Sequence, residues 1–294
     1  MVVLGSPPSQ GCPIPSQRLA AMIETISLTY AYNAGIFIFK DFNWKAQRGE
    51  TWAVLGPSGC GKTTLLYLLA GLRLPTSGVV LINNQALTRP RPRTGLILQD
   101  YGLLPWATVQ QNAALGLRVR NFYGPDGTHA PENYLPHLHV RPWLERLGLA
   151  SLADKYPGQL SGGQRQRTAI ARTLALQPDL LLMDEPFSSL DAPTRESLQN
   201  LTLELQKEND LTLVIVTHSI EEAAVMGSKI LLLAPPPNTQ AEVIENPVAS
   251  QPGYRSSFEY TRITQELRLR LEAFSAQEEA PTGQGTIIIP DETP

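Results

Sequence analysis

The sequence has little cysteine, no long apolar run and little excess of charge of either sign. Its 294 residues include 2 cysteines, Cys12 and Cys60, which supply no disulfide framework and fit a reducing compartment. No apolar run approaches the ~18 residues of a membrane-spanning helix, so we expect a soluble protein that needs a partner to work at a membrane. A formal net charge of −3 gives no sign of broad nucleic-acid affinity, and we expect no nucleic-acid partner.

The beginning of the chain also lacks a signal-peptide pattern, because it has neither a charged region nor an apolar core. It is rich in Pro, Ser, Gly and Gln. We therefore expect residues 1–21 to form a flexible N-terminal arm.

A phosphate-binding loop is the strongest signal in the chain. An apolar strand ends at Leu55, the segment Gly56–Thr63 matches G-x-x-x-x-G-K-[ST] at every fixed position, and an apolar helix follows. Glycines allow consecutive backbone N–H groups to point at one anion, and the helix N-terminus favours phosphate. Lys62 would reach the β- and γ-phosphates, and the Thr63 hydroxyl would bind Mg²⁺. The residues expected to contact the nucleotide here are Gly56, Pro57, Ser58, Gly59, Cys60, Gly61, Lys62, Thr63 and Thr64.

Two carboxylates end a second buried strand. The run Leu180–Met183 is apolar without alternation, as in a parallel sheet covered on both faces, and Asp184 and Glu185 follow it. The carboxyl ends of parallel strands form the ligand edge of such a sheet. Asp184 therefore suits the Mg²⁺ shell, and Glu185 suits the polarisation of an attacking water.

Three further positions are candidates for contacts with the nucleotide. His218 follows the apolar strand Thr212–Thr217 and could hydrogen-bond a γ-phosphate. Tyr30, near an exposed-looking strand end, either stacks on a purine or is an ordinary strand aromatic. Ser161 is a good helix N-cap before Gly162 and Gly163, so this helix start either binds an anion or is plainly capped.

A histidine-containing stretch offers a possible metal site. His129, His137 and His139 fall within residues 121–140, which are poor in pattern and rich in Pro and Gly. Their irregular spacing, without a nearby cysteine, favours a solvated loop over a metal site.

Taken together, these segments resemble the nucleotide-binding subunit of ATP-binding cassette (ABC) transporters. The resemblance rests on Gly56–Thr63 (Walker A), Gln99 (Q-loop), Leu160–Gln164 (the LSGGQ signature), Leu180–Glu185 (Walker B) and Ser189–Asp191 (D-loop), with His218 as the switch histidine. It implies an α/β fold of the P-loop type, with a parallel-sheet core, an antiparallel β subdomain and an inserted helical subdomain. It also implies an ABC ATPase domain over residues 22–235, with the helical subdomain at about 100–170, and a C-terminal extension and tail over 236–294.

The resemblance implies ATP and Mg²⁺ as cofactors and gives each residue a role. Lys62 and Gln99 join Glu185 and His218 as catalytic groups, and Thr63, Gln99 and Asp184 would hold the metal ion. Tyr30 looks like the adenine-stacking aromatic, with Tyr32 as second choice. From a partner copy facing head to tail, the nucleotide would be covered by Ser161, Gly162, Gly163, Gln164 and Asp191.

The partners follow from the same resemblance. They are a second ATPase subunit, identical or paralogous, a transmembrane permease docking near Gln99–Val119, and indirectly an extracytoplasmic solute-binding protein. The segment Leu103–Trp106 looks like that of importer ATPases for nitrate, sulfonates and taurine, whereas Gln164-Arg165 departs from the Met-Arg common in that group. We expect a peripheral subunit on the cytoplasmic face of the inner membrane.

Three alternatives compete with this interpretation. A soluble ABC ATPase of translation or DNA repair usually carries two cassettes or long coiled coils, and neither is present. A kinase or GTPase switch would leave the signature unexplained, and no Asn-Lys-x-Asp sequence occurs. An importer of another class of small solute stays open.

Overall fold

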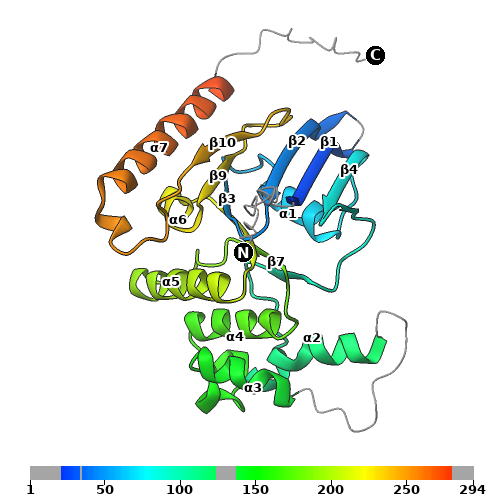
Figure 1. The fold of residues 1–294 in the computed structure, drawn as a ribbon, viewed down its shortest axis with the longest axis vertical. Coiled ribbons are helices and arrows are strands. Elements are labelled where there is room, and N and C mark those ends of the chain that lie inside the picture. The colour runs from blue at the N-terminus through cyan, green and yellow to red at the C-terminus, as the bar shows by residue number, and fades with distance from the viewer. Residues whose placement is uncertain (1–20, 34, 124–136, 280–294) are drawn as a thin grey trace, which may run out of the picture.

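A six-stranded, mainly parallel sheet forms the centre of the molecule (Figure 1). The computed structural model describes residues 21–33, 35–123 and 137–279. The strand order is β10-β9-β3-β8-β7-β6, and only β10 runs antiparallel to its neighbour. The strands are β3 (Thr51–Leu55), β6 (Thr94–Ile97), β7 (Leu180–Asp184), β8 (Thr212–Thr217), β9 (Lys229–Leu232) and β10 (Glu242–Glu245).

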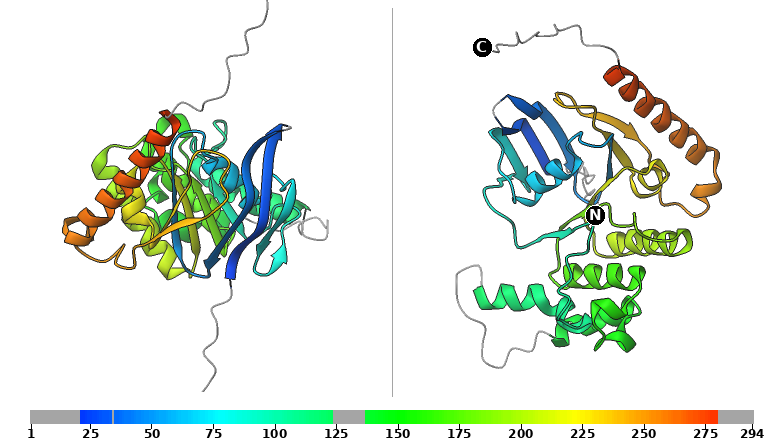
Figure 2. Two further views of the ribbon diagram at one scale, coloured as in Figure 1. Left: turned by 90° about the horizontal axis from the view of Figure 1, so that it is seen from above. Right: turned by 180° about the vertical axis from the view of Figure 1, so that it is seen from behind.

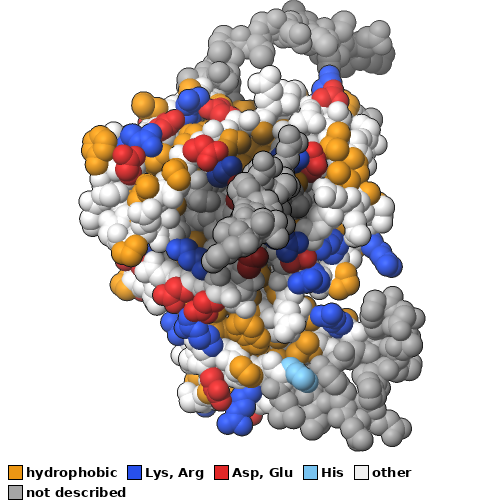
Figure 3. Space-filling model, viewed as in Figure 1, with side chains coloured by type: hydrophobic (Ala, Val, Ile, Leu, Met, Phe, Trp, Pro, Cys, Tyr) orange, Lys and Arg blue, Asp and Glu red, His pale blue; other side chains and the backbone are white. Residues whose placement is uncertain are grey.

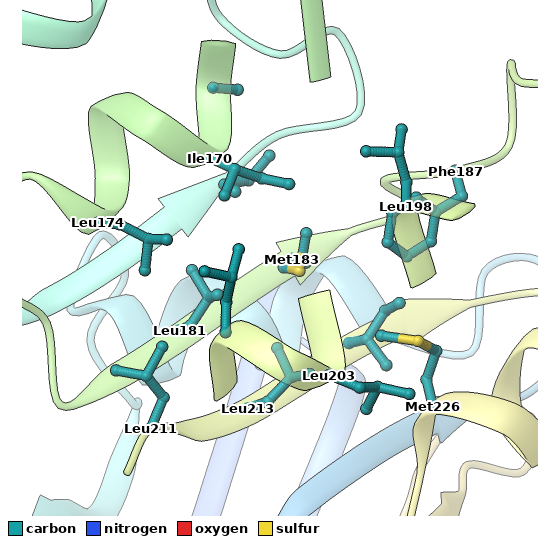
Figure 4. Packing of buried hydrophobic residues seen from close by; sticks show 14 of the residues in the cluster. Ile170, Leu174, Leu181, Met183, Phe187, Leu198, Leu203, Leu211, Leu213 and Met226 are labelled. Atoms are coloured by element: carbon teal, nitrogen blue, oxygen red, sulfur yellow. The ribbon is translucent and has the colours of Figure 1, made fainter. Parts of the chain in front are cut away.

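The central strands are buried on both faces, as their unbroken apolar runs predict. Every residue of β3, β7 and β8 is buried. Alternate side chains enter two different cores, so that Leu181 and Met183 join one cluster while Leu180 and Leu182 join the other. Figure 4 shows the first cluster, where Leu181, Met183 and Leu213 meet Ile170 and Leu198 from helices. The predicted parallel α/β core is confirmed.

Helices cover both faces of this sheet. Helix α1 (Lys62–Ala70) packs on one face, against β6, β7 and β8, and its leucines belong to the second core. Helix α6 (Ile220–Met226) packs on the other face against β3 and β8 and also contacts α5 (Ala192–Glu208). Asp191 and Ser219 cap the starts of α5 and α6.

A second, antiparallel sheet lies beside the phosphate loop's helix. Its order is β2-β1-β4-β5, with β1 (Ala21–Asn33), β2 (Ile36–Gln47), β4 (Ser77–Ile82) and β5 (Gln85–Ala86). Strands β1 and β2 form a hairpin in which Asn33 pairs with Ile36. Asn83 and Asn84, which connect β4 to β5, both have positive φ, 51° and 61°.

A group of helices lies at the end of the molecule away from the antiparallel sheet (Figures 1 and 2). Helix α4 packs on α2 and α3, and α2 also contacts α3. The group consists of α2 (Val109–Tyr123), α3 (His137–Arg146), the short turns η1 (Ala150–Leu152) and η2 (Pro157–Gln159), and α4 (Gly162–Leu174). His129 lies outside the described residues, and no group of three potential metal-ligating side chains occurs in the part of the chain that is described.

The C-terminal region continues the fold beyond residue 235. Strand β10 adds an antiparallel edge to the main sheet, and helix α7 (Phe258–Glu279) follows the turn η3 (Tyr254–Ser256) and packs against α6. Figure 1 shows α7 running along the side of the sheet formed by β9 and β10. Ile244, Ile263 and Leu267 are buried in the first core, and Leu271 and Phe274 pack against it, so this region is part of the packed fold through residue 274. Across the described ranges, no helix combines the length and apolar character required to span a bilayer.

Candidate functional site

The loop Gly56–Gly61 connects β3 to α1 and is shaped by glycine. Gly59 and Gly61 have φ of 79° and 105°, in the left-handed region. A Cβ on Gly56 would lie 2.4 Å from the Leu233 carbonyl oxygen, so a side chain cannot fit there. Ser58 and Gly59 are exposed, whereas Cys60 is buried, and burial raises the pKa of its thiol against the opposing effect of Lys62. Cys60 is therefore a small packing residue under the loop.

Lys62 lies inside this loop. Its Nζ donates to the carbonyl oxygens of Gly56 and Pro57, each at 2.8 Å, and the residue is 8% exposed. The curled loop thus surrounds the ammonium group with its own backbone. A phosphate bound by the loop's N–H groups would meet this positive charge.

Thr63 and Asp184 are 121 positions apart in the sequence and lie next to each other in the fold. The Thr63 hydroxyl donates to Asp184 Oδ1 at 3.3 Å, across the carboxyl ends of β3 and β7. Burial raises the pKa of the Asp184 carboxyl and the charge of Glu185 adds to it, while the Thr63 hydrogen bond and Lys62 oppose them. These two oxygen donors fit a hard cation such as Mg²⁺, which prefers oxygen ligands.

Glu185 lies between two other predicted residues. Its Oε2 is 3.0 Å from His218 Nδ1 and accepts from Gln99 Nε2 at 3.3 Å. Glu185 has φ of 43°, a left-handed conformation uncommon outside glycine. The His218 side chain is 61% exposed and that of Glu185 21%, so the group opens to solvent at the carboxyl edge of the sheet.

The signature segment caps its helix as predicted. Ser161 Oγ accepts from Gln164 N at 3.3 Å, and Gln164 Oε1 accepts from Ser161 N at 2.9 Å, which forms a capping box. Gly163 allows close packing of α4 on α5, since a Cβ there would lie 2.6 Å from Thr194 Cγ2. Ser161 is exposed, so its helix start is accessible to a second molecule.

Asp191 also caps a helix, because its Oδ2 accepts from Thr194 N at 3.2 Å at the start of α5. This hydrogen bond lowers the pKa of the Asp191 carboxyl. The side chain is exposed. The carboxylate therefore holds the segment that joins the Walker B strand to α5.

The expected exposure of Tyr30 is wrong. Tyr30 is 7% exposed, its hydroxyl accepts from Arg73 Nη1 at 2.9 Å, and its ring is packed edge-on to Tyr32. Tyr32, the second choice, is 49% exposed, and its hydroxyl lies 2.8 Å from Thr64 Oγ1 at the phosphate-loop helix. Exposure increases from Leu28 along β1 toward its hairpin end, so the exposed end of the strand is at Tyr32 and not at Tyr30. Tyr32 replaces Tyr30 as the candidate for base stacking.

Sequence reasoning missed Tyr101. Its hydroxyl lies 2.8 Å from Ser189 Oγ, and its backbone carbonyl accepts from Arg172 on α4 at 2.7 Å. The two residues are 88 positions apart in the sequence, so a local sequence pattern cannot predict their contact. The only sequence signal is that Tyr101 follows Gln99 by two residues and Ser189 follows Glu185 by four.

The surface in Figure 3 carries charges of both signs. Lysine and arginine side chains are interspersed with aspartate and glutamate over this face rather than gathered in one basic patch.

Comparison with known proteins identifies relatives of the chain. The sequence model of the family "ABC transporter" matches residues 39–188. A taurine import ATP-binding protein from Pseudomonas aeruginosa is 42% identical over 221 residues, 75% of this chain and 80% of that protein. An aliphatic sulfonates import ATP-binding protein from Bacillus cereus is 35% identical over 229 residues, 78% of this chain and 86% of that protein. Among solved structures, the dimeric ATP-binding cassette MJ0796 bound to ADP and Pi has a TM-score of 0.64 and 31% identity, covering 76% of this chain and 98% of that one.

Proposed function

The chain belongs to the ABC transporter family, and from that premise we propose which of its residues bind and hydrolyse ATP in the subunit that drives an importer for a small solute. The observation that carries the proposal is the meeting of Lys62, Asp184, Glu185 and His218 at the carboxyl edge of β3, β7 and β8. Ligands of open parallel sheets bind at that edge.

The triphosphate lies in the Gly56–Thr63 loop in this proposal. Backbone N–H groups of the loop neutralise it together with the Lys62 ammonium, which the carbonyl oxygens of Gly56 and Pro57 hold inside the loop. Thr63, Asp184 and Gln99 would hold Mg²⁺, which supplies charge neutralisation at the phosphates when bound. The fit rests on the paired oxygens of Thr63 and Asp184, 3.3 Å apart. Tyr32 stacks on the base.

Glu185 orients and polarises the attacking water. One carboxylate oxygen, Oε2, contacts both His218 Nδ1 and Gln99 Nε2, and these two contacts fix the position of the carboxylate. His218, largely exposed, hydrogen-bonds the γ-phosphate and helps to orient the same water. Positioning and charge stabilisation dominate phosphoryl transfer, so each group should matter even though none forms a covalent bond.

A second copy completes the site. Ser161 is exposed at the start of α4, and such a helix N-terminus is competent to bind an anion, while the chain's own phosphate loop would cradle one triphosphate. If two copies face head to tail, each signature segment covers the nucleotide of the other. Gly162, Gly163, Gln164 and Asp191 belong to this covering surface. The dimeric state of the related cassette MJ0796 supports the arrangement.

The permease docks on the helical side of the molecule. Trp106 is 73% exposed. An apolar groove of about 790 Å³ lies between β6, α2 and α4 and is bordered by Leu96, Leu115 and Leu176. An exposed tryptophan before the start of α2 and an apolar groove along α2 both suit contact with a helix of a partner protein. A separate membrane-bound permease is the partner that the importer relatives favour.

The solute proposed is a taurine-like sulfonate, or nitrate, selected outside this chain by the permease and an extracytoplasmic binding protein. The subunit is then peripheral to the cytoplasmic face of the inner membrane. We divide the chain into an N-terminal arm (1–21), the ATPase domain (22–235, with its helical subdomain at about 100–170) and a C-terminal extension (236–294).

Two measurements test the proposal. Purified protein should hydrolyse ATP only with Mg²⁺, and Lys62→Ala should abolish the activity. A strain lacking this chain should lose growth on taurine as sole sulfur source or on nitrate as sole nitrogen source. Growth unaffected on both would refute the solute class, and the absence of Mg²⁺-dependent hydrolysis would refute the ATPase.

A further inference from the structure

The segment Gln99–Tyr101 contacts both ends of the segment Glu185–Ser189. Gln99 Nε2 donates to Glu185 Oε2 at 3.3 Å, and the Tyr101 hydroxyl lies 2.8 Å from Ser189 Oγ. Two side chains spaced two residues apart therefore clamp a turn whose first residue is the proposed water-polarising carboxylate.

The turn transmits position from Ser189 to Glu185. Ser188 N and Ser188 Oγ both donate to the Glu185 carbonyl oxygen, at 3.4 and 3.0 Å. Glu185 and Tyr101 have φ of 43° and 65°, in the left-handed region. A non-glycine residue keeps this conformation only where surrounding contacts enforce it. The contacts of Gln99 with Glu185 and of Tyr101 with Ser189 are contacts of this kind.

Tyr101 is itself fixed from the signature helix. Arg172 on α4 donates to the Tyr101 carbonyl oxygen at 2.7 Å and to the Gly102 carbonyl oxygen at 2.6 Å. Tyr101 is 6% exposed. Its hydroxyl therefore meets Ser189 from a fixed position. The contacts of Arg172 with Tyr101 and of Tyr101 with Ser189, followed by the turn from Ser189 back to Glu185, connect α4 to Glu185.

We propose that Tyr101 is a positioning residue for ATP hydrolysis, whose hydroxyl, through Ser189, holds the Glu185 carboxylate in its working place. The inference rests on the proposed ATPase function and goes beyond it, because it assigns Tyr101 a role through its contact with Ser189. It links the strand-end loop that carries Gln99 to the turn that carries Glu185, so a shift of α4 would reach the carboxylate.

The test is a double-mutant cycle with Tyr101→Phe and Ser189→Ala in the full chain. Each single variant should lower kcat about three- to tenfold, the size expected for one positioning hydrogen bond, with KM for ATP within about twofold of wild type. The double variant should fall no further than either single variant, because both remove the same contact. Thermal midpoints should stay within about 2 °C of wild type.

Tyr254→Phe is the matched control, since it also removes a buried tyrosine hydroxyl with a 2.8 Å hydrogen bond, to Asn246, far from the site. It should leave kcat unchanged. Normal turnover in Tyr101→Phe, or losses that multiply in the double variant, would overturn the inference while wild-type hydrolysis stands. Inactive wild-type protein would instead refute the proposed function. If Tyr101→Phe does not fold, Ser189→Ala, at an exposed position, decides alone by its kcat.

Discussion

Glu185 Oε2 lies 3.0 Å from His218 Nδ1. The two residues follow neighbouring parallel strands, β7 and β8, so the sheet itself brings them together. This pair joins the carboxylate that would polarise water to the group that would sense the γ-phosphate.

Replacing Glu185 by Gln should separate binding from turnover. The amide keeps the shape and a hydrogen-bonding oxygen, but it cannot accept a proton, so we expect ATP binding within about threefold of wild type and turnover reduced about a hundredfold or more. Nucleotide binding by fluorescence titration and phosphate release measure the two effects. Normal turnover in Glu185→Gln would remove the role assigned to the carboxylate.

Base stacking should depend on Tyr32 and not on Tyr30. Tyr32→Ala removes an exposed ring beside the phosphate-loop helix, and ATP affinity should fall about five- to a hundredfold, the range of one base–aromatic stack. Tyr30→Phe removes only the hydroxyl of a buried ring and serves as the control, with unchanged affinity. If the two effects were reversed, the assignment to Tyr32 would be wrong.

Asp184→Asn should stabilise the nucleotide-free protein while abolishing activity. A carboxyl whose folded-state pKa is raised by burial favours the folded state most when protonated, and its ionisation reduces the free energy of unfolding as pH rises through that pKa. The neutral amide removes this loss, so the thermal midpoint at pH 7.5 should rise by about 2 °C.

The Asp184→Asn advantage should shrink as the pH falls below the raised pKa, where the wild-type carboxyl is protonated too. Asp191→Asn is the control of opposite sign, because the Thr194 hydrogen bond lowers the pKa of Asp191 and its ionised form stabilises the fold. A lower midpoint for Asp184→Asn at pH 7.5 would contradict the electrostatic account.

Transport should depend on Trp106 more than hydrolysis does. Trp106 is 73% exposed and lies outside the nucleotide site, so Trp106→Ala should leave basal ATP hydrolysis unchanged and lower solute uptake about tenfold in cells. Phe258→Ala removes an equally exposed aromatic, 77%, at the start of α7 and should leave both unchanged. Unchanged uptake in Trp106→Ala would count against docking at this segment.

The sequence indicated the core and most of the site because those signals are local. Continuous apolar runs predicted β7 and β8, the phosphate loop predicted its own strand and helix, and Ser161 predicted an N-cap. The carboxylates and His218 were placed at one edge because parallel strands share their carboxyl ends.

What the sequence could not give depends on distant packing. Tyr30 is buried and Tyr32 exposed although they are two residues apart in one strand, and alternation with a period of two cannot tell such residues apart. Strand β10 has only four residues, Glu242–Glu245, with an acid at each end, so its sequence alone does not predict a strand. Its pairing with β9 depends on the rest of the fold. The contact of Tyr101 with Ser189 requires the whole fold.

The central claim is that one molecule's Lys62 loop and another molecule's Ser161 helix start hold the same triphosphate. Light scattering of Glu185→Gln with ATP tests it most directly, since hydrolysis no longer dissolves the complex. We expect the mass of a dimer with ATP and of a monomer without it, and a monomer when Ser161→Arg is added, although this double variant still binds ATP. A dimer that survives Ser161→Arg, or a Glu185→Gln protein that stays monomeric while saturated with ATP, would contradict the claim.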